Sequence, residues 1–208
     1  MLDTGVLARC GLDAIAAAEA ILEGGARTLQ LRHKGHFSRE IYRCAERMAR
    51  LCDEARVMFV VNDRADLALM LGTALHVGQD DLPPQTARRV VGDSTVIGFS
   101  THNEAQLRSA VDEPVDYLAI GPMFATSSKE NPDPVVGVDE LRRLRPLTNR
   151  PLVAIGGITR ANAGAVLAAG ADSLAVIGDL FPENTTSIAL RARTQEWIAI
   201  AGEPVRPR

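Results

Sequence analysis

The stretch that decides the fold is TLQLRHK, residues 28–34. Because side chains alternate across a strand, its two leucines face one side, while Gln30, Arg32 and Lys34 face the other. Helical periodicity flanks this stretch on both sides, over 12–22 and 38–54. The sequence therefore predicts a strand that packs against helices on one face and presents an amide and two cations on the other.

The same alternation continues to the end of the chain. Further strands are predicted at 57–61, 74–77, 96–99, 117–120, 152–155 and 173–177, with helices between them and after them. Near-continuous apolar strands separated by helices are typical of a parallel sheet. Eight predicted helices in 208 residues, with no linker or shift in composition, favour a single (β/α)₈ TIM barrel domain over 1–208.

The first strand of such a barrel is the weakest part of the pattern. Residues 1–8 contain few apolar side chains, and Asp3, Thr4 and Gly5 interrupt them. We therefore expect a first strand that is short and irregular, or missing because the natural chain begins upstream of Met1. An open seven-stranded doubly wound sheet is the alternative, but no Gly-x-Gly-x-x-Gly follows any predicted strand.

Composition excludes several classes of protein. The chain is 46% hydrophobic and 24% charged with a net charge of −3, which argues against disorder and against nucleic acid as a partner. Its apolar runs are strand-sized and its first residues do not resemble a signal peptide, so a cytoplasmic protein without a membrane partner is expected. Cys10, Cys44 and Cys52 show no metal-site spacing, which indicates reduced, buried thiols.

Lysine is rare in this chain. Of its 23 cationic residues, 21 are arginine and only Lys34 and Lys129 are lysine. An ammonium group suits the binding of phosphate oxygens or, in an apolar surround, the formation of a Schiff base. Two solvated loop lysines remain the alternative interpretation.

Polar residues follow successive predicted strands at the end where barrels hold their active sites. Arg32 and Lys34 suit a diphosphate, although both could also extend into water. Asp63 and Asp81, after the next two strands, could share a Mg²⁺ whose shell substrate phosphates complete, although each could instead cap the helix that follows it.

Two further segments suit a second anion. The segment 121–137 is too long for a simple connection and carries Thr126, Ser128 and Lys129. Gly157 and Gly178 follow the last two predicted strands, where many barrels bind phosphate on backbone N–H groups, although turn glycines are common there too.

In this order, the residues resemble the thiamine phosphate synthase family from about Gly24 to Gly178. The motifs are Gln30-x-Arg32-x-Lys34, Asn62-Asp63, His76-x-Gly78-Gln79-x-Asp81, Gly98-x-Ser100-x-His102, Gly121-Pro122, Thr126-x-Ser128-Lys129, Ile155-Gly156-Gly157-Ile158 and Ile177. The chain departs from the usual pattern at His33, Ser128 and Gly178, where the family commonly has an acidic residue, threonine and serine.

The resemblance implies a Mg²⁺-dependent transferase that joins 4-amino-2-methyl-5-pyrimidinylmethyl diphosphate to a thiazole phosphate, giving thiamine phosphate and diphosphate. It implies Mg²⁺ on Asp63 and Asp81, with no acid or base residue assigned. The residues implied to hold the pyrimidine diphosphate are Gln30, Arg32, Lys34, Asn62, Ser100 and Lys129. Those implied to surround the thiazole phosphate are Thr126, Ser128, Gly157, Ile177 and Gly178.

Three other functions are compatible with parts of this pattern. A thiazole tautomerase-like isomerase would bind one phosphate and would not need the paired carboxylates or the Arg32–Lys34 pair. A non-catalytic sensor of thiamine phosphate would form no product. A Schiff-base aldolase would need Lys34 or Lys129 in an apolar surround, which neither has. A homo-oligomer is compatible with each of these functions.

Overall fold

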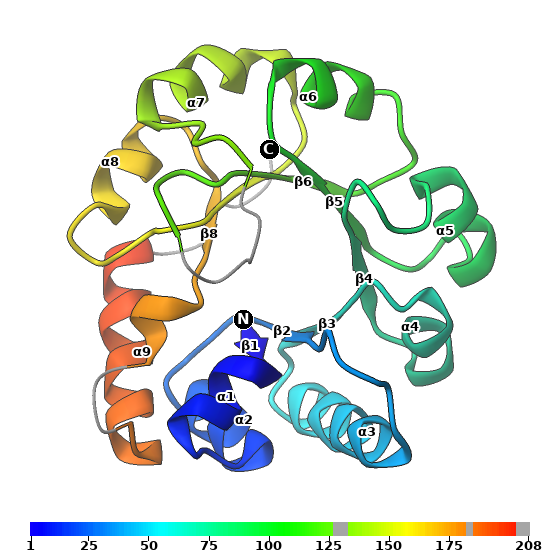
Figure 1. Cartoon of the computed structure of the whole chain (residues 1–208), viewed down its shortest axis with the longest axis vertical. Helices are drawn as coiled ribbons and strands as arrows, with labels where there is room; N and C mark the ends of the chain where they lie inside the picture. Colours follow the sequence, from blue (N-terminus) through cyan, green and yellow to red (C-terminus); the bar gives the residue numbers. More distant parts are fainter. Residues whose placement is uncertain (127–132, 182–184, 203–208) are drawn as a thin grey trace.

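The computed structural model describes residues 1–126, 133–181 and 185–202 and shows a TIM barrel. Its strands form one parallel sheet in the order β1 to β8, and Figure 1 shows them as an inner ring with the helices outside. The strands are β1 Leu2–Asp3, β2 Thr28–Arg32, β3 Met58–Asn62, β4 Ala74–Val77, β5 Ile97–Thr101, β6 Tyr117–Ile120, β7 Leu152–Ile155 and β8 Ser173–Ala175.

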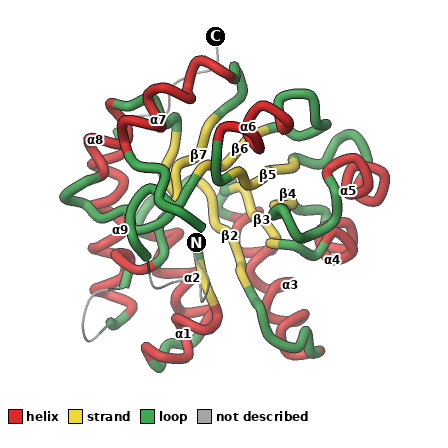
Figure 2. The backbone as a smooth tube through the Cα atoms, turned by 45° about the horizontal axis from the view of Figure 1, so that its top comes forward, coloured by secondary structure: helices red, strands yellow, loops and turns green. Residues whose placement is uncertain are grey.

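Helices connect and flank the strands, and Figure 2 shows them in red outside the yellow sheet. They are α1 Thr4–Cys10, α2 Ala14–Glu23, α3 Arg39–Glu54, α4 Ala65–Leu71, α5 Pro84–Val91, α6 Glu104–Ala110, α7 Val138–Leu144, α8 Ala163–Ala168 and α9 Ser187–Ala201, with short 3₁₀ turns η1 Arg145–Leu147 and η2 Gly178–Leu180. No helix in these described ranges is long and apolar enough to cross a membrane.

The core lies between the sheet and the helices, as the alternation in β2 predicts. Leu29 and Leu31 are 0% and 2% exposed and belong to one apolar cluster with buried residues of the helices. Met48 of α3 is fully buried in the same cluster, with Ala45 one turn before it. Because the leucines face outward, the intervening Gln30 is directed into the barrel, where it lines the central cavity.

The first strand is present and short. Leu2 and Asp3 pair in parallel with Leu31 and Arg32 of β2, so the sheet has eight strands and the open seven-stranded alternative is wrong. On the other side, the Met1 amino group donates a hydrogen bond to the Val176 carbonyl at 3.1 Å, just beyond β8. Within the described residues, β1 and β8 do not pair as strands. The hydrogen bond from Met1 to Val176 joins these two ends of the sheet.

Among the α-helices in the described ranges, α1 is the one that the periodicity did not predict. The Asp3 side chain accepts a hydrogen bond from the Val6 N–H at 3.0 Å and caps its first turn, and Gly11 ends it in the left-handed conformation. Asp3 and Gly11 at the ends of α1 are residues typical of loops, and Gly5 lies inside the helix. The helical pattern in the sequence is therefore weak. The cap is what allows the chain to turn from β1 directly into a helix.

Candidate active site

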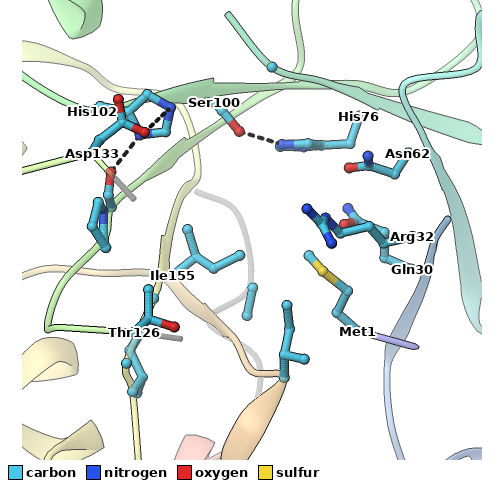
Figure 3. A pocket seen from close by; sticks show the side chains of 18 of the residues that line it. Met1, Gln30, Arg32, Asn62, His76, Ser100, His102, Thr126, Asp133 and Ile155 are labelled. Atoms are coloured by element: carbon cyan, nitrogen blue, oxygen red, sulfur yellow. Dashed lines mark hydrogen bonds and ion pairs between the residues drawn. The ribbon is translucent and has the colours of Figure 1, made fainter. Parts of the chain in front are cut away.

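A cavity of about 580 Å³ opens at the carboxyl ends of the strands. All the predicted site residues that fall in the described ranges line it, and Ser128 and Lys129 lie outside those ranges. Figure 3 shows Gln30, Arg32, Asn62 and His76 on one side of the cavity, with Thr126 and Ile155 on the other. The predicted residues are Gln30, Arg32, Lys34, Asn62, Asp63, Asp81, Ser100, Thr126, Gly157, Ile177 and Gly178.

Arg32, the last residue of β2, and Lys34, two residues beyond the strand, each face a carboxylate. Arg32 forms an ion pair with Asp3, and Lys34 forms one with Asp63. Only 20% of the Arg32 side chain is exposed, which argues against the alternative in which it extends into water. The guanidinium has five N–H donors, so the pair with Asp3 leaves donors for an anion in the cavity.

Asp63 and Asp81 lie close enough to influence each other. The pKa of the Asp63 carboxyl is raised above its usual range, first by burial and then by Asp81, while Lys34 opposes the shift. Two crowded carboxylates beside an ammonium group indicate a position that favours positive charge.

Neither carboxylate caps a helix, contrary to the alternative interpretation. Helix α4 has Arg64 at its cap position and α5 has Pro83, and neither cap is made by a side chain. Asp81 instead accepts the Gly78 N–H at 2.7 Å within its own loop. Asp63 has a left-handed backbone with φ of 68°, and its N–H donates to the His76 carbonyl at 2.8 Å.

Gln30 presents an unused acceptor at the base of the cavity. The residue is 9% exposed, and its Oε1 has no hydrogen-bond partner within the described part of the chain. A buried polar atom without a partner is costly, roughly 1–3 kcal/mol, and a ligand that donates a hydrogen bond removes that cost. This atom therefore indicates where a polar donor of the ligand binds.

The opposite side of the cavity is built from the loops after β6 and β7. The N–H groups of Met123 and Phe124 donate to the carbonyls of Ile155 and Gly156 at 2.9 and 3.0 Å, so the two loops are held together. Gly157 has φ of 65°, and a Cβ placed there would be 2.6 Å from the Ala125 carbonyl oxygen. Only glycine allows this close approach.

Asp3 was missed by the sequence pattern although it contacts a predicted site residue. Its Oδ1 caps α1 at the Val6 N–H, and its Oδ2 pairs with Arg32. The next residue, Thr4, has its hydroxyl 2.8 Å from Nδ1 of His33, in the loop that leads to Lys34. The short first strand and the start of α1 therefore support the residues at the carboxyl end of β2. In the sequence, only the polarity of Asp3 and Thr4 indicated this contact.

Replacement of Asp3 by Asn should loosen Arg32 while keeping an acceptor for the helix cap. We expect kcat/KM for the substrate that Arg32 holds to fall by roughly 10-fold, because the loss of one charged partner of a hydrogen bond is worth about 1.5–3 kcal/mol. Asp13→Asn is the matched control, since Asp13 caps α2 through the N–H groups of Ile15 and Ala16 in an exposed position. Equal kinetics for the two variants would contradict a positioning role for Asp3.

His76 and His102 also line the cavity without a predicted role. His76 lies between the hydroxyls of Ser100 and Tyr117, and burial lowers its pKa to about 4. Nδ1 of His102 is 2.6 Å from the Gly121 carbonyl, and its Nε2 is 3.6 Å from Asp133. Both belong to quoted motifs, but their partners come from other strands and loops.

Comparison with known proteins agrees with this geometry. The family model described as thiamine monophosphate synthase matches residues 6–180. Thiamine-phosphate synthase of Koribacter versatilis is 51% identical over 184 residues, covering 88% of this chain and 84% of that protein. The Laribacter hongkongensis thiamine-phosphate synthase is 41% identical, with 92% and 90% covered.

A solved structure agrees as well. Thiamine phosphate pyrophosphorylase from Pyrococcus furiosus superposes with a TM-score of 0.79 at 31% identity, over 90% of this chain and 88% of that one. The segment that the family model matches, residues 6–180, spans β2 to β8, the cavity loops and both groups of predicted ligands. The chain therefore belongs to the thiamine monophosphate synthase family.

Proposed function

We propose that the chain is a transferase that joins 4-amino-2-methyl-5-pyrimidinylmethyl diphosphate to a thiazole phosphate, forming thiamine phosphate and diphosphate. The observation that carries this proposal is the division of one cavity into two sides. Paired cations and paired carboxylates lie at the ends of β2 to β4, and glycine loops lie after β7 and β8. One side suits a diphosphate with a metal ion, and the other suits a single phosphate.

The pyrimidine diphosphate fits the first side. Arg32 and Lys34 provide the charge, while Asn62 and Ser100 line the same wall. Gln30 Oε1 is free to accept a hydrogen bond from the exocyclic amino group of the pyrimidine. Lys129 is assigned to the diphosphate from the sequence motif alone.

Asp63 and Asp81 fit a Mg²⁺ ion. The described residues contain no cluster of three or more His, Cys, Asp or Glu for a metal, so an all-protein cage is absent from that part of the chain. Mg²⁺ is commonly bound by one or two carboxylates plus substrate phosphates and water, which matches the pair found here. When bound, Mg²⁺ would neutralise charge on the diphosphate oxygens.

The thiazole phosphate fits the second side. The loop at Gly157 and the turn that begins at Gly178 line the cavity beside Ile177 and Thr126, where their backbone N–H groups would be available to a phosphate. A Cβ on Gly178 would meet nothing within 4 Å, so a larger residue such as the family's usual serine would fit there. The backbone contributes the N–H donor at this position, and Ser128 adds a hydroxyl by the sequence motif.

The residues of the chain mainly orient the two substrates and stabilise charge. The C–O bond to diphosphate breaks with both electrons on the oxygen, and the lone pair of the thiazole nitrogen forms the new C–N bond. Arg32 and Lys34 stabilise the negative charge that grows on the leaving group, an electrostatic contribution that is often the largest in catalysis. Binding of both substrates in one cavity holds the nucleophile close to the reacting carbon.

The direct test is incubation of the protein with both substrates and Mg²⁺, followed by separation of the products. The proposal requires thiamine phosphate and diphosphate in equal amounts. Isomerisation of the thiazole without release of diphosphate would identify a tautomerase instead. Binding of thiamine phosphate with no product formation would identify a sensor.

Gln30→Leu should separate binding from stability. We expect KM for the pyrimidine diphosphate to rise by roughly 10-fold or more, because the variant cannot accept a hydrogen bond from the exocyclic amino group of the bound pyrimidine. The thermal midpoint should stay the same or rise, since the variant removes an orphaned buried acceptor from the free protein. Steady-state kinetics and thermal unfolding measure the two effects, and an unchanged KM would exclude Gln30 from the pyrimidine site.

A further inference from the structure

Three side chains from three neighbouring strands form a hydrogen-bonded series at the cavity wall. The Tyr117 hydroxyl of β6 is 3.0 Å from Nδ1 of His76 of β4, and Nε2 of His76 is 2.8 Å from the Ser100 Oγ of β5. The His76 and Tyr117 rings are stacked with centroids 5.6 Å apart. Figure 3 shows the contact between His76 and Ser100 as a dashed line at the edge of the cavity.

The packing around this series is specific. In the sheet register Gly98 lies between His76 and Tyr117, and a Cβ placed on Gly98 would be 2.0 Å from the Tyr117 ring. The glycine leaves the space through which the tyrosine ring reaches across β5 to the histidine. This accounts physically for the glycine two residues before Ser100.

The direction of the hydrogen bonds follows from the chemistry of the two outer groups. His76 is 8% exposed, and its ring nitrogens face the hydroxyls of Tyr117 and Ser100 rather than an acidic side chain. Neither hydroxyl compensates the burial of a charged imidazolium, so the ring is neutral and has one donor and one acceptor. Burial raises the pKa of Tyr117, so the phenol keeps its proton. A phenol is a better donor than acceptor, and no second partner for its hydroxyl occurs among the described residues.

The Tyr117 O–H therefore donates to Nδ1 of His76, which places the ring proton on Nε2. The Nε2–H donates to Ser100 Oγ, and the Ser100 hydrogen remains available for the cavity. With the opposite tautomer, Ser100 would donate to His76 and present only lone pairs. The orientation of one imidazole thus decides whether Ser100 is a donor or an acceptor toward the ligand.

We propose that His76, held by Tyr117, is a positioning residue that fixes Ser100 as a hydrogen-bond donor to the pyrimidine diphosphate. The identity of the ligand rests on the proposed function. The direction of the hydrogen bonds does not, because it is a property of the free protein.

The first test reads the tautomer without any substrate. Protein labelled with ¹⁵N at histidine gives long-range ¹H–¹⁵N correlations that distinguish an Nε2–H ring from an Nδ1–H ring, and the spectrum of His76→Gln identifies the His76 signals. We expect the Nε2–H tautomer in the wild-type protein. An Nδ1–H ring or a charged ring at pH 7 would overturn the proposal.

The second test is a double-mutant cycle between His76 and Ser100. His76→Leu should lower kcat/KM for the pyrimidine diphosphate by roughly 10-fold, since Ser100 then no longer has a partner that keeps its hydrogen directed at the charged ligand. His76→Gln, whose amide can still donate to Ser100, should recover most of that loss. In a Ser100→Ala background, His76→Leu should have little further effect.

Each outcome has one meaning. A loss from His76→Leu that is the same in the Ser100→Ala background would show that His76 acts on something other than Ser100 and would overturn the proposal. Failure of the leucine variant to fold would leave the decision to the wild-type tautomer. Absence of product from the wild-type protein would contradict the proposed function and not the hydrogen-bond direction.

Discussion

Asp63→Asn is expected to lower turnover by roughly 100-fold or more without unfolding the protein. The variant removes one of the two carboxylates proposed to bind Mg²⁺, and a metal ion contributes several kcal/mol of charge stabilisation to reactions of this kind. Asparagine tolerates the left-handed backbone found at this position, with φ of 68°, so the fold should be unaffected. Turnover at saturating Mg²⁺ and the thermal midpoint measure the two effects.

Asp66→Asn is the matched control for this variant. Asp66 lies three residues further on in α4, with its side chain 59% exposed and paired with Arg64. It should retain full turnover. Asp81→Asn should behave like Asp63→Asn, and EDTA should stop the wild-type reaction. Full activity in EDTA would remove the metal ion and both carboxylates from the proposal.

Gly157→Ala is expected to weaken binding of the thiazole phosphate by roughly 100-fold. Its Cβ would lie 2.6 Å from the Ala125 carbonyl oxygen and 2.8 Å from the Phe124 carbonyl oxygen, which are main-chain atoms, and the φ of 65° is itself unfavourable for alanine. The loops after β6 and β7 must separate to admit it. The expected signature is a rise in KM for the thiazole phosphate that exceeds any rise for the pyrimidine diphosphate.

Gly164→Ala tests whether any added methyl group has this effect. Gly164 lies in α8, and a Cβ there would meet nothing within 4 Å. Because alanine favours helix more than glycine does, this variant should be slightly more stable and kinetically normal. If Gly157→Ala left the KM for the thiazole phosphate unchanged, that phosphate would bind elsewhere.

Most of the barrel could be predicted because β2 to β7 are largely buried, so their sequences are apolar runs. The side chains at their carboxyl ends could be predicted too, since parallel strands end at the same rim. Gln30 and Arg32 follow from simple alternation within β2, and Lys34 continues that alternation two residues beyond the strand. The structure brings all three to the cavity as expected. These predictions needed only local patterns and the general geometry of the fold.

Other features depend on contacts that no local pattern contains. A strand of two residues, Leu2–Asp3, gives no alternation, so its pairing with β2 could not be seen in the sequence. The pairing of Asp3 with Arg32 and of His76 with Tyr117 joins residues 29 and 41 positions apart, through the register of neighbouring strands. A carboxylate that follows a strand could cap the next helix or bind a metal ion, and the sequence does not distinguish the two roles. The structure excludes the capping role, because no side chain caps α4 or α5.

The left-handed backbone at Asp63 lowers the stability of this protein at a position that its proposed activity requires. That conformation costs an L-amino acid roughly 1 kcal/mol, and a half-buried carboxylate beside a second one adds to the cost. Glycine at this position would avoid both. Selection of variants for heat resistance alone would therefore enrich replacements of Asp63 that unfold at higher temperature and no longer turn over substrate.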